Sequence, residues 1–188
     1  MSERLDALAA AVCDCKHCKL SDSRRHLVFG TGAETAAVML VGEAPGEQED
    51  LQGKPFVGPS GQLLDLYLNA VGLDRGKNVY IANILKCRPP YNRDPAPEEI
   101  AVCLPWLREQ VKIIRPAVIV CLGRIAATTL ISPDFRVTRQ HGQFFEKGGI
   151  DFMGTFHPSA LLRDPAKKGL ALYDFLALED RLRERGIL

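Results

Sequence analysis

Four of the six cysteines are spaced as the ligands of a metal centre could be. Cys15 and Cys18 form a C-x-x-C pair, Cys87 lies far along the chain, and Cys103 follows inside the next predicted helix. One local pair and two distant thiolates can hold either zinc or an iron–sulfur cluster. Because structural zinc sites more often use two local pairs, the spacing favours a cluster. Two alternatives stay open: Cys87 and Cys103 could be ordinary buried thiols, and Cys13 could replace Cys15.

A second group of residues forms a glycine- and proline-rich segment with many carboxylates. Val41–Asp50 reads VGEAPGEQED, and Gly53–Gly61 continues as GKPFVGPSG. Backbone rich in glycine can approach a ligand closely, and Phe56 offers an aromatic face on which a planar ligand can stack. The alternative is a solvated acidic turn, but so many Gly and Pro residues in one long segment favour binding.

Regular elements must position these residues, and the apolar pattern predicts where the elements lie. Continuous apolar runs are typical of strands buried in a parallel sheet, and capped amphipathic stretches predict helices. We expect strands at 37–41, 79–85 and 117–122, a hairpin of 144–145 with 151–153, and helices at 3–12, 60–71, 97–114 and from Asp164-Pro165 onward. Residues 43–59 are expected to form a long loop. Strands that alternate with helices predict an α/β fold whose mostly parallel sheet is covered on both faces.

Three polar segments follow these strands at their carboxyl ends: Glu43–Asp50, Asn83–Cys87 and His157–Arg163. Open parallel sheets bind their ligands at that edge. The three segments therefore predict one functional site, with Asn83 able to supply both a hydrogen-bond donor and an acceptor.

Length and charge narrow the function classes. The 188 residues fit one domain spanning 1–188. The net charge of +1 excludes a protein coated with basic residues, so any contact with nucleic acid must come from local basic clusters. No apolar run reaches the roughly 20 residues of a membrane helix, and the N-terminus lacks the core of a signal peptide. We therefore expect a cytoplasmic protein without a membrane partner, whose cysteines serve as thiols or metal ligands rather than disulfides.

The motifs Val41–Asp50, Gly53–Gly61, Asn83–Pro90 and His157–Leu162, in this order and with these cysteines, resemble the family 4 uracil-DNA glycosylases. The resemblance runs from about Cys15 to about Arg163. It implies a three-layer α/β/α sandwich with a central four-stranded parallel sheet. It also implies a structural [4Fe–4S] cluster on Cys15, Cys18, Cys87 and Cys103, and hydrolysis of the N-glycosidic bond of uracil in DNA, which leaves an abasic site for base excision repair.

The resemblance implies a role for each residue of the predicted site. A glycosylase flips its target base out of the duplex and recognises the base by its hydrogen-bonding edge. We assign this recognition to Asn83. Phe56 would stack on the flipped ring. His157 would donate a hydrogen bond to the uracil oxygen as negative charge develops, and the backbone N–H groups around Glu43 and Ala44 would add further donors.

Two assignments are less specific. A carboxylate must orient water or stabilise the sugar cation, and the resemblance points to Glu49 first and Glu43 second. The residues after His157 are expected to form a loop that ends at Arg163, in which Leu161 could wedge into the base stack while Arg163 and the following lysines meet phosphates. Its alternative role is to pack the start of the last helix.

Other function classes remain to be weighed. A non-catalytic iron–sulfur module that binds DNA or accompanies a polymerase would keep the fold and the cluster without the chemistry. An electron-transfer protein is disfavoured, because ferredoxin-like cysteine runs are absent. We expect uracil-containing DNA, single- or double-stranded, as the partner. A monomer suits a DNA-scanning enzyme, and recruitment by a sliding clamp is left open.

Overall fold

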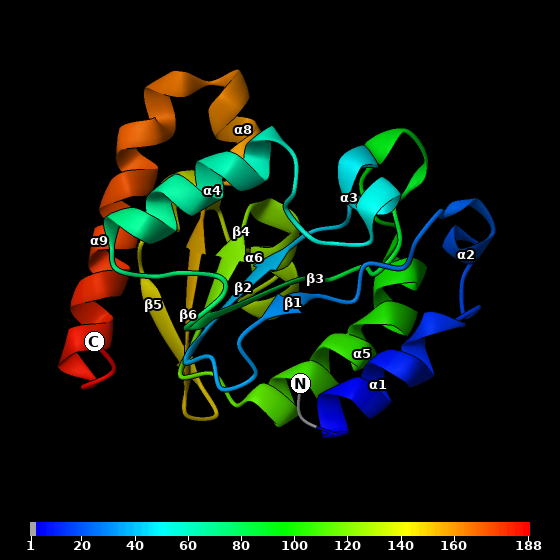
Figure 1. Cartoon of the computed structure of the whole chain (residues 1–188). Helices are drawn as coiled ribbons and strands as arrows, with labels where there is room; N and C mark the ends of the chain where they lie inside the picture. The colour runs from blue at the N-terminus through cyan, green and yellow to red at the C-terminus, as the bar shows by residue number, and fades with distance from the viewer. Residues whose placement is uncertain (1–2) are drawn as a thin grey trace.

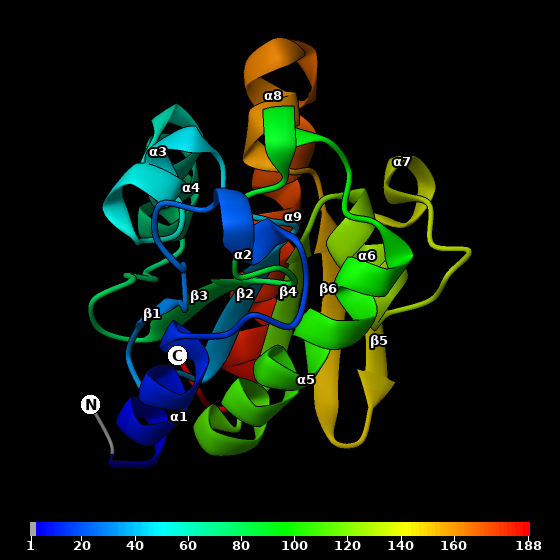
Figure 2. The same ribbon diagram turned by 90° about the vertical axis from the view of Figure 1, so that its right-hand side faces the viewer.

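A sheet of six strands runs through the part of the protein that the computed structural model describes, residues 3–188. Residues 1 and 2 of the predicted domain lie outside the described residues. The strand order is β1-β3-β2-β4-β6-β5, and helices cover both faces (Figure 1, Figure 2). The strands are β1 (Thr31–Gly32), β2 (Val38–Gly42), β3 (Val79–Asn83), β4 (Val118–Leu122), β5 (Phe144–Lys147) and β6 (Ile150–Thr155). The predicted α/β/α arrangement is confirmed.

The sheet is wider than the four-stranded sheet that the resemblance implied. Strands β3, β2, β4 and β6 are parallel and form its centre. Among the described residues, one short antiparallel strand is added at each edge, β1 beside β3 and β5 beside β6. The strand β1 escapes sequence analysis because its two residues, Thr31 and Gly32, contain no apolar run. The strand β5 is the first arm of the predicted hairpin, which is present.

The helices form one layer on each side of the sheet. Their bounds are α1 (Glu3–Cys13), α2 (Leu20–Ser23), α3 (Glu47–Gln52), α4 (Pro59–Ala70), α5 (Pro97–Ile114), α6 (Arg124–Leu130), α7 (Val137–Gln140), α8 (Pro158–Arg163) and α9 (Lys168–Glu184), with 3₁₀ turns η1 (Pro90–Asn92) and η2 (Pro165–Lys167). Helices α4 and α9 share one core with the sheet, and α1, α5 and α6 share the other.

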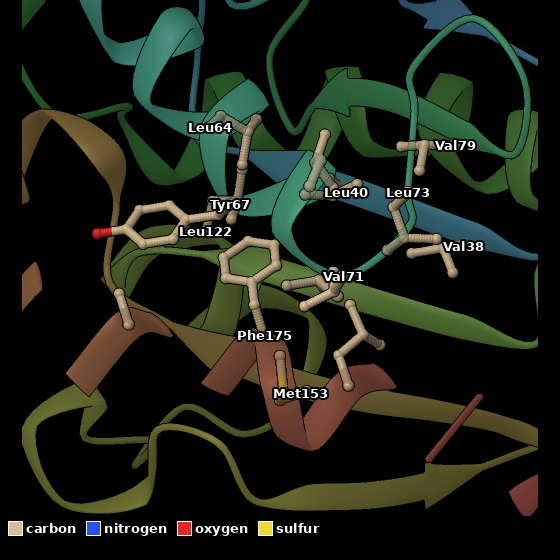
Figure 3. Packing of buried hydrophobic residues seen from close by; sticks show 14 of the residues in the cluster. Val38, Leu40, Leu64, Tyr67, Val71, Leu73, Val79, Leu122, Met153 and Phe175 are labelled. Atoms are coloured by element: carbon tan, nitrogen blue, oxygen red, sulfur yellow. The ribbon is translucent and has the colours of Figure 1, made fainter. Parts of the chain in front are cut away.

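Alternation along the strands divides the core into these two clusters. In β2, Val38 and Leu40 belong to the cluster under α4 and α9, whereas Met39 and Val41 belong to the opposite one, as expected for a pleated strand buried on both faces. Figure 3 shows the first cluster, in which the rings of Tyr67 and Phe175 are stacked with centroids 5.2 Å apart. These two packed layers hold the carboxyl ends of the four parallel strands at one edge.

Three local predictions need correction. The expected loop of residues 43–59 contains α3, whose first turn is closed by Glu49 accepting from the Gly46 N–H at 3.1 Å. The segment after His157 is the helix α8 rather than a loop, because the His157 side chain caps it by accepting from the Ser159 N–H. Asp164-Pro165 begins the 3₁₀ turn η2, and the final helix starts at Lys168.

Candidate active site

A cleft of about 780 Å³ opens at the carboxyl ends of the parallel strands, and all three predicted polar segments contribute to its lining. It brings together the side chains or backbone of Glu43, Ala44, Glu49, Phe56, Asn83 and His157. These six come from the ends of β2, β3 and β6 and from the segment around α3. The predicted convergence at one sheet edge is therefore found, with α3 and α8 at the same end of the molecule (Figure 1).

Asn83 is the last residue of β3 and is 1% exposed. Within residues 3–188, its side-chain Oδ1 has no hydrogen-bond partner. Its register partner in β2 is Gly42, where a Cβ atom would lie 2.4 Å from that oxygen and 2.8 Å from the Phe56 ring. A buried acceptor without a donor costs about 1–3 kcal/mol, so this oxygen is suited to a ligand N–H.

Phe56 lies over the same part of the cleft, and its ring centroid is 5.6 Å from that of His157. Its backbone has φ 52, a left-handed conformation that is unfavourable for a side chain with a Cβ. Arg75 holds this conformation by donating to the carbonyl oxygens of Phe56 at 3.1 Å and Pro55 at 3.3 Å. Arg75 is held in turn by Asp65 of α4, at 2.6 Å.

His157 follows β6 and has one ring nitrogen bound to the protein. Its Nδ1 accepts from the Ser159 backbone N–H at 3.1 Å and lies 2.8 Å from the Ser159 hydroxyl. A backbone N–H can only donate, so Nδ1 is the acceptor and the proton of the neutral ring is on Nε2. Burial, with a smaller contribution from the Arg163 charge and opposed by Glu49, lowers the pKa of His157 to about 4. The ring therefore offers an uncharged N–H donor at neutral pH.

The Glu49 carboxylate connects the segment 41–50 to the segment 53–61. Its Oε1 accepts from the backbone N–H groups of Val57 at 2.9 Å and Gly58 at 3.1 Å, and its Oε2 accepts from Gly46. Glu49 thus fixes the start of α3 against the backbone that follows Phe56, besides lining the cleft.

Glu43 directly follows β2, and its surroundings shift the pKa of its carboxyl in opposite directions. Burial raises the pKa of its carboxyl, Asp94 raises it further, and Arg124 opposes the shift. Arg124 and Asp94 form an ion pair with their charged atoms 2.5 Å apart, and both line the cleft. The backbone carbonyl of Glu43 accepts from the Leu85 N–H at 3.0 Å, which ties the end of β2 to the segment after β3.

One wall of the cleft was not predicted from the sequence. Residues Pro89, Asn92, Arg93 and Asp94, from the segment between β3 and α5, line it. Arg93 is fixed by a two-point contact with Glu99, at 2.6 and 2.9 Å. The signal in the sequence was the density of prolines from Pro89 to Pro97. It indicates a stiff segment but does not predict that this segment lies against the cleft.

The prediction for Leu161 is not supported. Its side chain is 1% exposed and belongs to the core cluster under α4 and α9, so it packs α8 against the fold. The adjacent Leu162 is 40% exposed. In a helix, consecutive residues lie on different faces, and a loop assignment could not distinguish between them.

The four predicted cysteine ligands line a second, smaller cavity together with Arg24, Lys86 and Trp106. Arg24 donates to the Cys87 sulfur at 3.3 Å, and the Lys86 backbone N–H donates to the Cys103 sulfur at 3.3 Å. Burial raises the pKa of the Cys87 thiol, which Arg24 opposes, and burial raises that of Cys103 to about 11.

The other two cysteines differ in their surroundings. Cys13 is exposed, and Cys121 is buried within β4. Over the described part of the chain, no three His, Cys, Asp or Glu side chains approach closely enough to ligate a single metal ion.

Lys86 lies between the two cavities and is fully buried. Its ammonium donates to the backbone carbonyl of Asn83 at 3.0 Å and to the side-chain carbonyl of Gln110 at 2.6 Å. Burial lowers the pKa of Lys86 to about 8. One residue thus contacts the end of β3 and, through its backbone, the cysteine cavity.

In residues 3–188, none of the helices has the length and apolar character needed to cross a membrane.

Comparison with known proteins adds a family to this geometry. Residues 29–177 match the family model described as the uracil DNA glycosylase superfamily. The chain is 44% identical to the type-4 uracil-DNA glycosylase of Archaeoglobus fulgidus over 171 residues, which is 87% of this chain and 85% of that protein. Identity is 38% with the Saccharolobus solfataricus type-4 enzyme, covering 98% and 89%, and 42% with that of Thermotoga maritima, covering 86% and 85%.

Proposed function

Because the chain belongs to the uracil DNA glycosylase superfamily, we propose that its cleft binds uracil flipped out of DNA and that the protein hydrolyses the N-glycosidic bond, leaving an abasic site for base excision repair. The observation that carries this proposal is Asn83, a buried amide whose Oδ1 has no partner within residues 3–188 and which lies against Phe56 in the cleft.

Asn83 distinguishes uracil from cytosine by the direction of its hydrogen bonds. Uracil presents an N–H next to a carbonyl oxygen, so the Asn83 Oδ1 accepts from the base while the amide nitrogen donates to it. Cytosine presents an acceptor and a donor in the reverse order and would leave the buried oxygen without a donor. A site built to satisfy a hydrogen bond rejects a base that leaves it unsatisfied.

His157 stabilises the leaving group. As the bond between the sugar C1′ and the base N1 breaks, its electron pair moves onto the uracil ring, and the sugar becomes cation-like. The Nε2–H of His157 donates to a uracil carbonyl oxygen, where the negative charge develops. The ring is neutral at pH 7 and donates as an uncharged N–H, and its contribution grows toward the transition state as the uracil oxygen becomes negative.

Glu49 is our first choice for orienting the attacking water, and Glu43 the second. A carboxylate has about four acceptor positions, and three of those on Glu49 are occupied by backbone N–H groups. The remaining position on Oε2 can hold one water in a fixed direction. The water adds its oxygen to C1′ and passes a proton to the Glu49 carboxylate, while the electron pair of the broken bond leaves with uracil as the anion. Burial and Asp94 make Glu43 easier to protonate, which suits it less to this role.

We propose that Cys15, Cys18, Cys87 and Cys103 hold a [4Fe–4S] cluster. Four cysteine thiolates are the usual ligand set of such a cluster, and these four cysteines line one cavity. No group suited to a single metal ion occurs among the described residues. The indole N–H of Trp106 lines the same cavity without a partner in residues 3–188, and N–H donors to sulfur are usual around such clusters.

When bound, the cluster supplies a cross-link and no step of the hydrolysis. We expect a monomer, as suits an enzyme that scans DNA, in a reducing compartment such as the cytoplasm, because none of the six cysteines forms a disulfide within residues 3–188. Recruitment by a sliding clamp remains a prediction.

The test is release of uracil from an end-labelled oligonucleotide that contains one uracil, followed by alkaline cleavage of the abasic site. We expect cleavage at uracil and none in strands with thymine or cytosine at that position. Asn83→Asp and His157→Ala should each lower the single-turnover rate by about a hundredfold or more, as loss of one preorganised donor does elsewhere. Folded wild-type protein that retains its metal, binds this DNA and releases no base would contradict the proposal and favour a non-catalytic module.

A further inference from the structure

The 3₁₀ turn η1 displays an aromatic side chain directly into solvent at the rim of the cleft. Tyr91 is 99% exposed, which is rare for a residue with so much apolar surface. Residues on both sides of it, Pro89 and Asn92, line the cleft. The turn lies next to α3, at the same end of the molecule as α8 (Figure 1). Tyr91 is therefore positioned to meet whatever enters the cleft.

The backbone that carries Tyr91 is held in an unfavourable conformation. Tyr91 has φ 55 and Asn92 has φ 53, so two consecutive residues with side chains are left-handed. This conformation is unfavourable, because it brings the Cβ atom too close to the following carbonyl oxygen. The Tyr91 ring makes no contact within the fold that would offset this, because it is almost wholly exposed. A glycine would satisfy the backbone better.

The turn is nevertheless rigidly attached. Backbone N–H groups of Asn92 and Arg93 donate to Pro89 and Pro90 carbonyls at 3.1 and 3.2 Å. The Arg88 guanidinium donates to the Asn92 side chain at 2.8 Å, and Arg93 is fixed on Glu99. A strained, anchored turn that presents an aromatic ring is typical of a preorganised binding residue.

We infer that Tyr91 binds DNA by stacking on the base adjacent to the flipped uridine in the same strand, an inference that rests on the proposed function. Flipping removes one neighbour from that base and leaves part of its face exposed. An aromatic face can replace the lost stack without reading sequence, which suits an enzyme that must act wherever uracil occurs. Arg88 and Arg93 flank the turn in the sequence, and their positive charges favour a phosphate backbone nearby.

The direct test is a double-mutant cycle between Tyr91 and the DNA. The probe is an oligonucleotide with one 2′-fluoro-deoxyuridine, whose glycosidic bond resists hydrolysis, and binding is followed by fluorescence anisotropy. Tyr91→Ala should raise Kd about tenfold, the order expected for one base–aromatic stack, and Tyr91→Phe should bind like the wild type. An abasic spacer in place of one neighbouring base should weaken wild-type binding similarly and Tyr91→Ala binding little further.

Three controls keep the outcome clear. Tyr173→Ala removes an aromatic side chain that is 71% exposed on α9 and outside the cleft, and it should bind like the wild type. Tyr91→Gly should weaken binding like Tyr91→Ala while unfolding at the same or a higher temperature, because glycine relieves the strain. Free uracil should inhibit all variants equally, since Tyr91 does not contact the flipped base.

Additive losses with spacers on both sides of the uridine, or unchanged binding by Tyr91→Ala, would overturn the inference. Failure of the proposed function would look different, because the wild type would then release no uracil and would bind the uracil analogue no better than a thymine strand. A wild type that releases uracil but shows no coupling to Tyr91 would sink this inference alone.

Discussion

At His157 a single backbone N–H decides which ring nitrogen carries the proton. The Ser159 N–H occupies Nδ1, so protonating the ring would put an N–H opposite another N–H. Burial and the Arg163 charge act in the same direction, and together they keep the pKa near 4. The same contacts therefore set the tautomer, the charge and the direction of the donor.

This leads to a pH prediction for His157. Above about pH 4 the ring is neutral and competent, so the acid limb of the single-turnover rate should fall near pH 4 rather than near the ordinary histidine value of 6.5. Arg163→Gln removes a charge that lowers this pKa, so the limb should move to higher pH. Histidine NMR spectra, with the His157 signal assigned by its absence in His157→Gln, measure the pKa directly. An unchanged pKa in Arg163→Gln would contradict the account.

The same residue contributes to the pH dependence of stability. Its pKa is lower in the folded than in the unfolded protein, so between about pH 6.5 and 4 the unfolded chain binds more protons. The free energy of unfolding should therefore fall as the pH drops through this window. His157→Gln should show a smaller decrease in urea unfolding experiments over the same range.

Gly42 and Asn83 give a steric prediction. A Cβ at position 42 would lie 2.4 Å from the Asn83 Oδ1 and 2.8 Å from Phe56, so Gly42→Ala must displace the side chains that meet the base. We expect kcat/KM for uracil release to fall about a hundredfold or more, the order lost with one preorganised donor, while the protein still folds. The matched control is Gly169→Ala in α9, where a Cβ meets nothing within 4 Å. Equal activity of both variants would contradict this.

At the scale of elements, apolar runs in the sequence predicted the parallel strands well. They did not reveal the short helices α3 and α8, whose first turns are closed by side-chain hydrogen bonds. The runs at 37–41 and 117–122 are read correctly because both faces of these strands are buried. Helix α3 was missed because its six residues contain a single leucine and are closed by the Glu49 side chain rather than by an apolar face. Leu161 was misplaced for a related reason, since burial of one leucine and exposure of the next depends on α8 packing against α4.

The site could be predicted as a set of residues but not as a geometry. Motif order pointed to Asn83, Phe56 and His157, and all three line one cleft. The support for these residues was not visible in the sequence, because Arg75 reaches Phe56 only through the fold. The wall that carries Arg93 was missed for the same reason.

Arg75 is a positioning residue for the turn at Phe56. Its guanidinium joins the carbonyls of Pro55 and Phe56 to Asp65 on α4. At Gly61 a Cβ would lie 1.8 Å from the Phe56 carbonyl oxygen, so that oxygen is pressed against α4 and accessible to Arg75. Arginine holds several acceptors in one plane, which lysine cannot do.

We therefore expect Arg75→Ala and Arg75→Lys to reduce uracil release through loss of alignment. A value of about tenfold in kcat/KM is reasonable for a misplaced stacking ring, because one stack is worth about 1–3 kcal/mol. Inhibition by free uracil should weaken in parallel, whereas DNA affinity measured with undamaged strands should not change. Arg108→Ala, at an exposed site on α5, is the control. Weakened binding to undamaged DNA would instead indicate a phosphate contact.

At the scale of the whole molecule, the segment that follows β3 contributes residues to both the cysteine cavity and the cleft. The cysteines follow α1, follow β3 and lie within α5, so a cluster there would join the N-terminal segment to the segment that carries η1. Lys86 connects this region to Asn83 by its ammonium and to Cys103 by its backbone N–H. Loss of a cysteine ligand should therefore increase the mobility of the cleft wall as well as that of the N-terminal segment.

Hydrogen exchange can measure this coupling independently of activity. Cys15→Ser should speed exchange of residues 13–27 and 86–96, two segments that each contribute residues to the cavity lining. The central strands β2 and β4 should stay protected, because their two buried faces do not depend on the cavity. Cys13→Ser, at an exposed thiol that does not line the cavity, should behave like the wild type. Reversed behaviour of the two variants would make Cys13 the ligand. Unchanged exchange at residues 86–96 in Cys15→Ser would mean that the prolines and Arg93 hold that wall without the cluster, and the coupling through Lys86 would then be wrong.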